Sequence, residues 1–184
     1  MTSLDLVPPL PPGGPDDVDG LIRFDSPLGR IEVVSRHDAI VALAVERDHH
    51  LPHDDRDETP DELVHAARRQ LQDYFAGVRR EFELPLRLEG TPFQRSVWAA
   101  LQQLAFGRST TYGLIAAAIG RPQAGRAVGG AIAANPLPLL VPCHRVLGRT
   151  GGVTGYTIGS GIPTKQWLLG HEGIVYRSGP MPVD

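Results

Sequence analysis

One stretch, STTYGLIAAAIGRPQAGRAVGGAIAANP (residues 109–136), constrains the fold more than any other part of the chain. Its first part opens with hydroxyl side chains and closes on Gly120, residue types that favour the two ends of a helix. Its second part repeats apolar residues at helical spacing and stops before Pro136. The sequence therefore predicts two short helices joined by a tight turn at residues 121–124.

The second of these helices has almost no bulky side chain outside its apolar stripe. Its small residues are Ala124, Gly125, Ala127, Gly129, Gly130 and Ala131. Small residues let a helix backbone approach another surface closely, and that surface is either a neighbouring helix or a ligand. Two short helices around a tight turn are also typical of a helix-turn-helix unit, which binds DNA.

The rest of the chain contains strands first and helices later. Residues 21–46 alternate apolar and polar side chains around the turn Ser26–Gly29, which indicates two or three antiparallel strands. A helix is expected over residues 58–78 and a short strand over EFELPLRL (residues 81–88). A further helix is expected over residues 91–104, with Phe93, Val97, Leu101 and Leu104 on its buried side.

This order predicts an α+β fold in two parts. Residues 21–88 would form a small antiparallel sheet with a helix, and residues 89–175 a mostly helical domain. Residues 1–20, rich in Pro, Gly and Asp, are predicted to be a disordered tail, and residues 176–184 a second tail.

Charge divides at nearly the same place. Residues 1–84 contain 9 Arg and 18 Asp or Glu, a balance of 9 − 18 = −9, whereas residues 85–184 contain 9 Lys or Arg and 3 acids, a balance of 9 − 3 = +6. The positive half could hold a polyanion while the acidic half stays clear of it. Chance clustering of surface charge would give the same numbers.

No apolar run approaches the length of a membrane span, and the N-terminus lacks the basic start and apolar core of a secretory signal. A cytoplasmic protein without membrane contact is therefore expected, and a single free thiol fits a reducing compartment. The loop with His49, His50 and His53 could bind a metal, but its spacing matches no strict site, so a solvated loop is preferred.

The only cysteine, Cys143, lies in the apolar run LLVPCHRVLG (residues 139–148) beside His144 and Arg145. Lone cysteines are usually inert core residues. Here the neighbouring positive charge would lower the thiol pKa and favour the thiolate. In an extended segment adjacent side chains point to opposite faces, so His144 is not expected to touch the sulfur directly. A hydrolase, a redox sensor and an alkyl acceptor all fit this pair.

From about Thr91 to Gly173 the chain resembles the methylated-DNA–protein-cysteine methyltransferases, also called 6-O-alkylguanine-DNA alkyltransferases. The resemblance rests on TTYGLIAAAIG, GRAVGGAIAAN, NPLPLLVPCHRVLG, GGVTGY and KQWLLGHEG, in this order. It implies a ribonuclease H-like N-terminal part and a winged helix-turn-helix-like C-terminal part. Residues 21–88 match only weakly.

The resemblance also implies a reaction. A monomer, with cooperative binding left open, would bind the minor groove of duplex DNA and flip out a 6-O-alkylguanine or 4-O-alkylthymine. It would then move the alkyl group irreversibly to its own Cys143. His144 would be the base, linked through water to Glu172, and Tyr112 the proton donor to the leaving guanine. Neither a metal nor a cofactor is needed.

Further residues receive roles by the same resemblance. Arg126 would fill the gap left by the flipped nucleotide, and Asn135 would be the hinge before the active-site segment. DNA contacts are expected from Tyr112, Gly113, Arg121, Ala127, Gly130 and Arg149, the two additional arginines mainly because of their charge. The alkyl pocket would be lined by Asn135, Pro138, Val146, Tyr156 and Thr157.

The chain departs from the family pattern in two places. The loop from Tyr156 to Lys165 is two residues longer, and it borders the expected alkyl pocket. The cysteine-rich zinc domain of the bifunctional members is missing, as are the cysteine ligands of a structural zinc.

Two other functions fit parts of the sequence. A non-catalytic relative would bind alkylated DNA without transfer, but such proteins replace the cysteine. A cysteine hydrolase would turn over, and it gives no reason for the positive half or for the small-surfaced helix.

Overall fold

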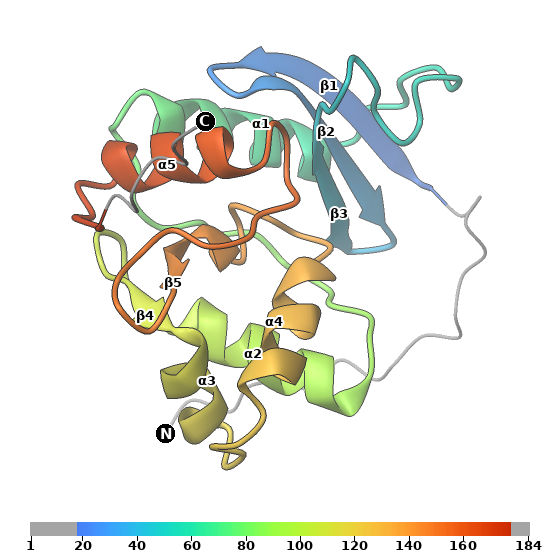
Figure 1. Ribbon diagram of the computed structural model, residues 1–184. Coiled ribbons are helices and arrows are strands. Elements are labelled where there is room, and N and C mark those ends of the chain that lie inside the picture. The colour runs from blue at the N-terminus through green and yellow to red at the C-terminus, as the bar shows by residue number, and fades with distance from the viewer. Residues whose placement is uncertain (1–17, 178–184) are drawn as a thin grey trace.

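The computed structural model describes residues 18–177. A three-stranded antiparallel sheet, with strand order β1-β2-β3, comes first in the chain (Figure 1). Its strands are β1 (Gly20–Ser26), β2 (Gly29–Arg36) and β3 (Ala39–Val45). The predicted turn after Ser26 is confirmed, and Gly29 there has φ of +102°, a backbone conformation that other residues rarely adopt. The predicted tails lie outside the described residues except at their inner ends.

Helix α1 (Glu62–Phe75) packs across this sheet. It begins where Asp61 accepts a hydrogen bond from the Val64 amide at 2.9 Å, so the predicted helix starts a few residues later than expected. Its buried residues Val64, Ala67, Leu71 and Tyr74 repeat at three- and four-residue spacing.

The strand predicted at residues 81–88 is wrong. Only Leu86 forms an isolated bridge, to Ile40 at the edge of β3. Pairing is limited to two hydrogen bonds: the Ile40 amide donates to the Pro85 carbonyl, and the Arg87 amide donates to the Ile40 carbonyl. Pro85 has no N–H and therefore cannot donate a further bond to β3. This segment connects the two parts of the chain.

The C-terminal part begins with α2 (Pro92–Gln102), whose start is fixed by reciprocal hydrogen bonds between Thr91 and Gln94. Gly90 precedes it because a side chain there would lie 2.7 Å from the Trp98 ring. The two predicted short helices are confirmed as α3 (Tyr112–Ala118) and α4 (Gly125–Ala133). These three helices pack against one another in the lower half of Figure 1.

Four further elements complete the described part of the chain. A single 3-10 turn, η1 (Cys143–Arg145), leads into β5 (Val146–Leu147), which pairs in parallel with β4 (Thr110–Thr111). The last helix, α5 (Ile162–His171), lies beside α1 (Figure 1). One hydrophobic core runs through both parts of the chain, from Ile22 and Leu71 to Val128 and Cys143. No helix among residues 18–177 is long and apolar enough to cross a membrane.

Candidate active site

Asn135 fixes the segment that leads to the cysteine. Its side-chain amide donates to the Val141 carbonyl at 2.9 Å, and its carbonyl oxygen accepts from the Leu137 amide at 3.0 Å. One buried side chain therefore holds both ends of a loop in which Leu139 has φ of +69°. Pro138 is buried in the same loop. The loop leads to Cys143, which is part of the hydrophobic core.

The thiol of Cys143 is only 2 % exposed. Its sulfur lies 3.7 Å from the Tyr156 hydroxyl, within hydrogen-bonding range for sulfur. Burial raises the pKa of Cys143, and hydrogen bonds from Asn135 and Tyr156 and the charge of Lys165 oppose this only in part. The expectation of a lowered thiol pKa is therefore wrong for the free protein, because burial outweighs these favourable contacts.

His144 follows in the same 3-10 turn, not in the extended segment that was expected. It is fully buried, and its Nε2 lies 2.8 Å from Glu172 Oε1. The expected water between His144 and Glu172 is therefore wrong, since the two side chains bond directly. Burial lowers the pKa of His144, and the hydrogen bond to Glu172 only partly offsets it, so the imidazole is neutral near pH 7.

The ring nitrogens of His144 have different roles. An ionised carboxylate can only accept, so Nε2 must carry the hydrogen that it shares with Glu172. Nδ1 is then the nitrogen with a free lone pair, and it has no hydrogen-bond partner among residues 18–177. The geometry thus leaves one buried, unpartnered base next to the cysteine in the chain.

Glu172, the residue after α5, is held by several donors. Arg145 Nε lies 2.7 Å from Oε2 and its Nη2 2.9 Å from Oε1, and the Gly107 amide donates to Oε2 at 3.3 Å. Burial alone would raise the pKa of Glu172, but the hydrogen bonds from His144 and Arg145 outweigh it and bring the pKa to about 2. Glu172 is therefore an anion throughout the physiological range, and it neutralises the charge of Arg145.

Lys165, the only lysine of the chain, was not predicted as a site residue. Its ammonium donates to the carbonyls of Val146 at 2.6 Å and Thr154 at 3.0 Å. Burial lowers the pKa of Lys165 to about 8. The ammonium thus joins the strand after the thiol to the loop before Tyr156. Its uniqueness in the sequence was a signal that could have identified it.

The loop after Tyr156 lies against the N-terminal part. A side chain at Gly159 would be 3.1 Å from Val45 of β3. The loop borders a recess of about 390 Å³ that is lined by Arg47, Asp48, Tyr156, Thr157, Gly159, Ser160 and Gly161. Tyr156 thus reaches from this recess to the thiol, while Thr157 is exposed at its rim.

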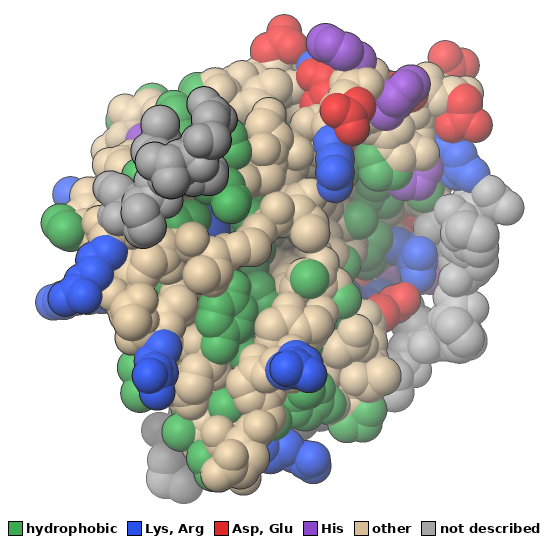
Figure 2. Space-filling view, in the orientation of Figure 1, with side chains coloured by type: hydrophobic (Ala, Val, Ile, Leu, Met, Phe, Trp, Pro, Cys, Tyr) green, Lys and Arg blue, Asp and Glu red, His purple; other side chains and the backbone are tan. Residues whose placement is uncertain are grey.

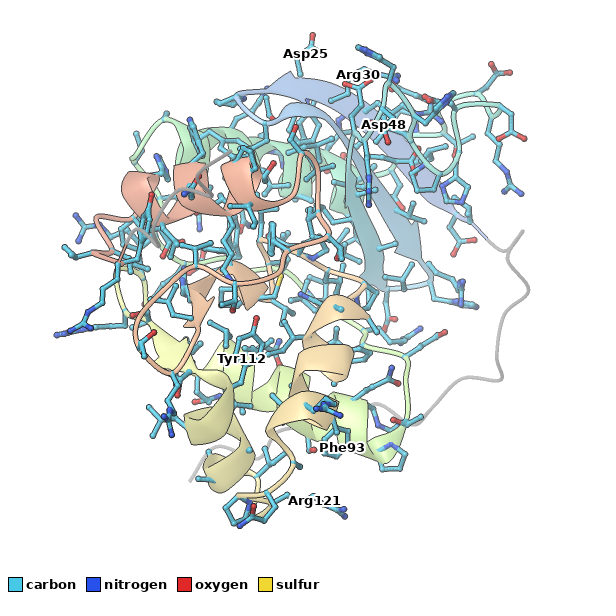
Figure 3. The ribbon with its side chains drawn as sticks, viewed as in Figure 1. Asp25, Arg30, Asp48, Phe93, Tyr112 and Arg121 are labelled. Atoms are coloured by element: carbon cyan, nitrogen blue, oxygen red, sulfur yellow. The ribbon has the colours of Figure 1, made fainter. Side chains whose placement is uncertain are left out.

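The residues predicted to contact DNA lie apart from the thiol, on a second surface. Gly113, Arg121, Arg126, Ala127, Gly130 and Arg149 are all exposed. Tyr112 is half-buried, and a side chain added at Gly129 would lie 3.8 Å from its ring, so Tyr112 sits between α3 and α4 (Figure 3). In the described part of the chain, Tyr112 makes no hydrogen bond to Cys143 or His144.

The small residues of α4 fall into two groups. Val128, Ala131 and Ile132 are buried against the other helices, whereas added side chains at Gly125 and Gly130 would meet nothing within 4 Å. Close helix packing therefore does not explain Gly130. Arg121, in the turn before α4, lies over the Phe93 ring at 5.9 Å (Figure 3).

Charge differs between the ends of the molecule. Figure 2 shows acidic and histidine side chains gathered over the sheet and the loop that follows it, and separate blue side chains around α3 and α4. In that loop, His53 Nδ1 lies 2.7 Å from Glu32 Oε1. No group of three potential metal ligands occurs among residues 18–177.

Models of one family match both parts of the chain. Residues 21–88 match the ribonuclease-like domain of 6-O-methylguanine DNA methyltransferase, and residues 92–174 match its DNA-binding domain. A constitutive methylated-DNA–protein-cysteine methyltransferase of Bacillus subtilis is 42 % identical over 159 residues, covering 83 % of this chain and 94 % of the relative. One from Mycolicibacterium paratuberculosis is 42 % identical over 149 residues, 80 % of this chain and 88 % of the relative.

Solved structures agree with the sequence relatives. The crystal structure of Mycobacterium tuberculosis O6-methylguanine methyltransferase has a TM-score of 0.74 and 40 % identity, covering 83 % of this chain and 92 % of that one. A second structure, of the Mycobacterium tuberculosis protein in complex with DNA, has a TM-score of 0.72 and 41 % identity over 82 % of this chain and 90 % of that one. The predicted α+β fold is thereby confirmed.

Proposed function

Because this chain belongs to the 6-O-methylguanine DNA methyltransferase family, we propose that it repairs alkylated DNA by moving the alkyl group from guanine to its own Cys143. The observation that carries the proposal is the buried constellation of Cys143, His144 and Glu172 at the centre of the C-terminal part. DNA is the partner, and its minor groove is the part that the small surface of α4 would fit.

The structure supports a specific order of proton transfers. Cys143 begins as a thiol, because its pKa is raised by burial. His144 Nδ1 takes the thiol proton through a water molecule, and Glu172 stabilises the imidazolium that forms. Thiolate formation thus depends on the base, because the charge of Lys165 offsets the burial of the sulfur only in part.

The transfer itself breaks one bond and forms one. The thiolate lone pair attacks the alkyl carbon, and the electrons of the carbon–oxygen bond pass to guanine O6. The developing guanine anion takes a proton from the Tyr112 hydroxyl. The proton that His144 took from the thiol then replaces it on Tyr112. A thiol and a 6-O-alkylguanine thus become a thioether and guanine. Water does not cleave a thioether, so each molecule acts once.

The other site residues receive supporting roles. Tyr156 and Pro138 would bound the alkyl group, Thr157 would lie at the rim of the recess, and the Val146 carbonyl, held by Lys165, would meet the guanine amine. Arg126 would occupy the space of the flipped nucleotide. We also propose that the protein binds DNA as a monomer and that it is located in the cytoplasm.

Mass spectrometry tests the proposal. Incubation with duplex DNA containing one 6-O-methylguanine should add about 14 Da to the Cys143 peptide, because a methyl replaces the thiol proton. Cys143→Ala should bind the same duplex and gain no mass. A methyl group on any other residue, or none in the wild-type protein, would contradict the proposal. A non-catalytic DNA binder is the alternative that the last result would favour.

A further inference from the structure

Tyr74 of α1 reaches the proposed active site from the N-terminal part of the chain. Its side chain is 1 % exposed, and its hydroxyl lies 2.8 Å from Glu172 Oε1, although the two residues are 98 positions apart in the sequence. Because Glu172 is ionised, the hydroxyl is the donor. The carboxylate that holds His144 is therefore also held by the other part of the molecule.

Three donors converge on the same carboxylate oxygen. Oε1 of Glu172 accepts from Tyr74 Oη at 2.8 Å, from His144 Nε2 at 2.8 Å and from Arg145 Nη2 at 2.9 Å. An oxygen that already accepts from two other groups is a weaker acceptor for the third. The Tyr74 hydroxyl therefore competes with His144 for the charge of Glu172.

Packing around the ring of Tyr74 holds its hydroxyl next to Glu172. Phe82, Phe106 and His171 surround it, with ring centroids 5.5, 6.2 and 4.9 Å away. His171 Nε2 also bonds the Tyr74 carbonyl at 2.8 Å. Burial and the charge of Glu172 raise the pKa of Tyr74, which keeps the hydroxyl protonated.

We infer that Tyr74 is a positioning residue for the alkyl transfer, whose hydroxyl limits how strongly Glu172 raises the basicity of His144. Without that hydroxyl, Glu172 would bind the His144 N–H more strongly and stabilise the imidazolium. His144 would then stay protonated to a higher pH and would be a base over a narrower range. The inference rests on the proposed function of Cys143.

The other charged groups around His144 set the background of this effect. Arg145 in η1 and Lys165 on α5 both disfavour a positive imidazole. Cys143 is the proposed proton donor. His171 on α5 faces Tyr74 and not the carboxylate. Removing only the Tyr74 hydroxyl leaves the charge of each of these groups in place. Arg145 bonds the same oxygen as His144, so the two share the stronger acceptor that Glu172 becomes.

The test is the pH dependence of the single-turnover rate constant. Wild type, Tyr74→Phe and the control Phe82→Leu are each mixed with an excess of 6-O-methylguanine duplex. Methyl transfer to Cys143 is then followed by intact mass. The control alters the packing of the Tyr74 ring and leaves its hydroxyl in place. The rate constant, unlike the yield, does not depend on the fraction of molecules that fold.

Tyr74→Phe should move the acid limb of the profile upward by about half a pH unit, which slows transfer roughly threefold below the limb and leaves the plateau no lower. Phe82→Leu should leave the limb in place. An unmoved limb in Tyr74→Phe, or an equal shift in both variants, would overturn the inference while wild-type transfer still stands. Absence of transfer in the wild type would instead overturn the proposed function.

Discussion

At the scale of single residues, the proposed site combines a buried thiol with a buried imidazole. Cys143 is uncharged in the free protein because it is buried, and His144 is uncharged for the same reason. Glu172 stays ionised because its donors outweigh its burial. In the free protein Cys143 is therefore in its less reactive form, since the thiolate is the nucleophilic form.

Arg126→Ala tests the role proposed for the residue that replaces the flipped base. The loss should impair transfer from duplex DNA about tenfold or more and leave transfer from the free modified base nearly unchanged, because extrusion costs a few kcal/mol only in the duplex. Single-turnover rates on both substrates measure the difference. Equal losses on the two substrates would mean that Arg126 supports the pocket or the fold.

The residues of the proposed site could be named from the sequence, but their connections could not. The run around Cys143 and the motif with Glu172 supplied the proposed nucleophile, the proposed base and the carboxylate that bonds this base. The direct bond between His144 and Glu172, and the partners Tyr74 and Lys165, depend on contacts between segments 19 to 98 residues apart. No local pattern around Tyr74 distinguishes it from an ordinary core tyrosine of an amphipathic helix.

At the scale of elements, capping residues and apolar periodicity determined most of the fold. Thr91, Thr111 and Gly120 mark helix ends where the sequence predicted them. The prediction failed at residues 81–88, where Pro85 limits the pairing with β3 to the surroundings of Ile40. It failed also at Cys143, because an apolar run does not distinguish an extended segment from a 3-10 turn.

Helix α4 offers a direct test of its proposed contact with DNA. In Gly130→Leu the new side chain enters open space, so the free energy of unfolding should stay level or rise by about 0.5–1 kcal/mol through better helix propensity. Affinity for duplex DNA should nevertheless fall at least about tenfold, because bulk would block the close approach of the helix.

Gly170→Leu is the matched control for this change. Gly170 lies on α5, is exposed, and has equally open space around it. The control should keep full DNA affinity in a binding titration. Unfolding of Gly130→Leu at lower denaturant with unchanged DNA affinity would show that Gly130 serves packing and not binding.

At the scale of the whole molecule, the two parts are joined rather than merely adjacent. They share one hydrophobic core, and Tyr74 links them at Glu172. Their charges nevertheless differ in sign, and the acidic end lies over the sheet, far from α3 and α4 in Figure 2. We expect the positive C-terminal part alone to hold the phosphates.

Salt dependence of DNA binding tests this division. Arg121→Ala and Arg149→Ala should each reduce the magnitude of the slope of log affinity against log salt by about one. The reason is that a phosphate which loses its arginine contact keeps its counterion when the protein binds. Arg69→Ala, an exposed arginine of α1, should leave the slope unchanged. A slope that responds to Arg69 but to neither of the other two would place DNA on the opposite side of the molecule.

We propose that one molecule carries out one irreversible transfer to its own cysteine. The most direct measurement is a titration of excess 6-O-methylguanine duplex with known amounts of protein, counting repaired guanines at completion. We expect a limit of one repaired guanine per protein molecule, matched by one S-methylated Cys143. Continued repair beyond that limit, with Cys143 still unmodified, would contradict it.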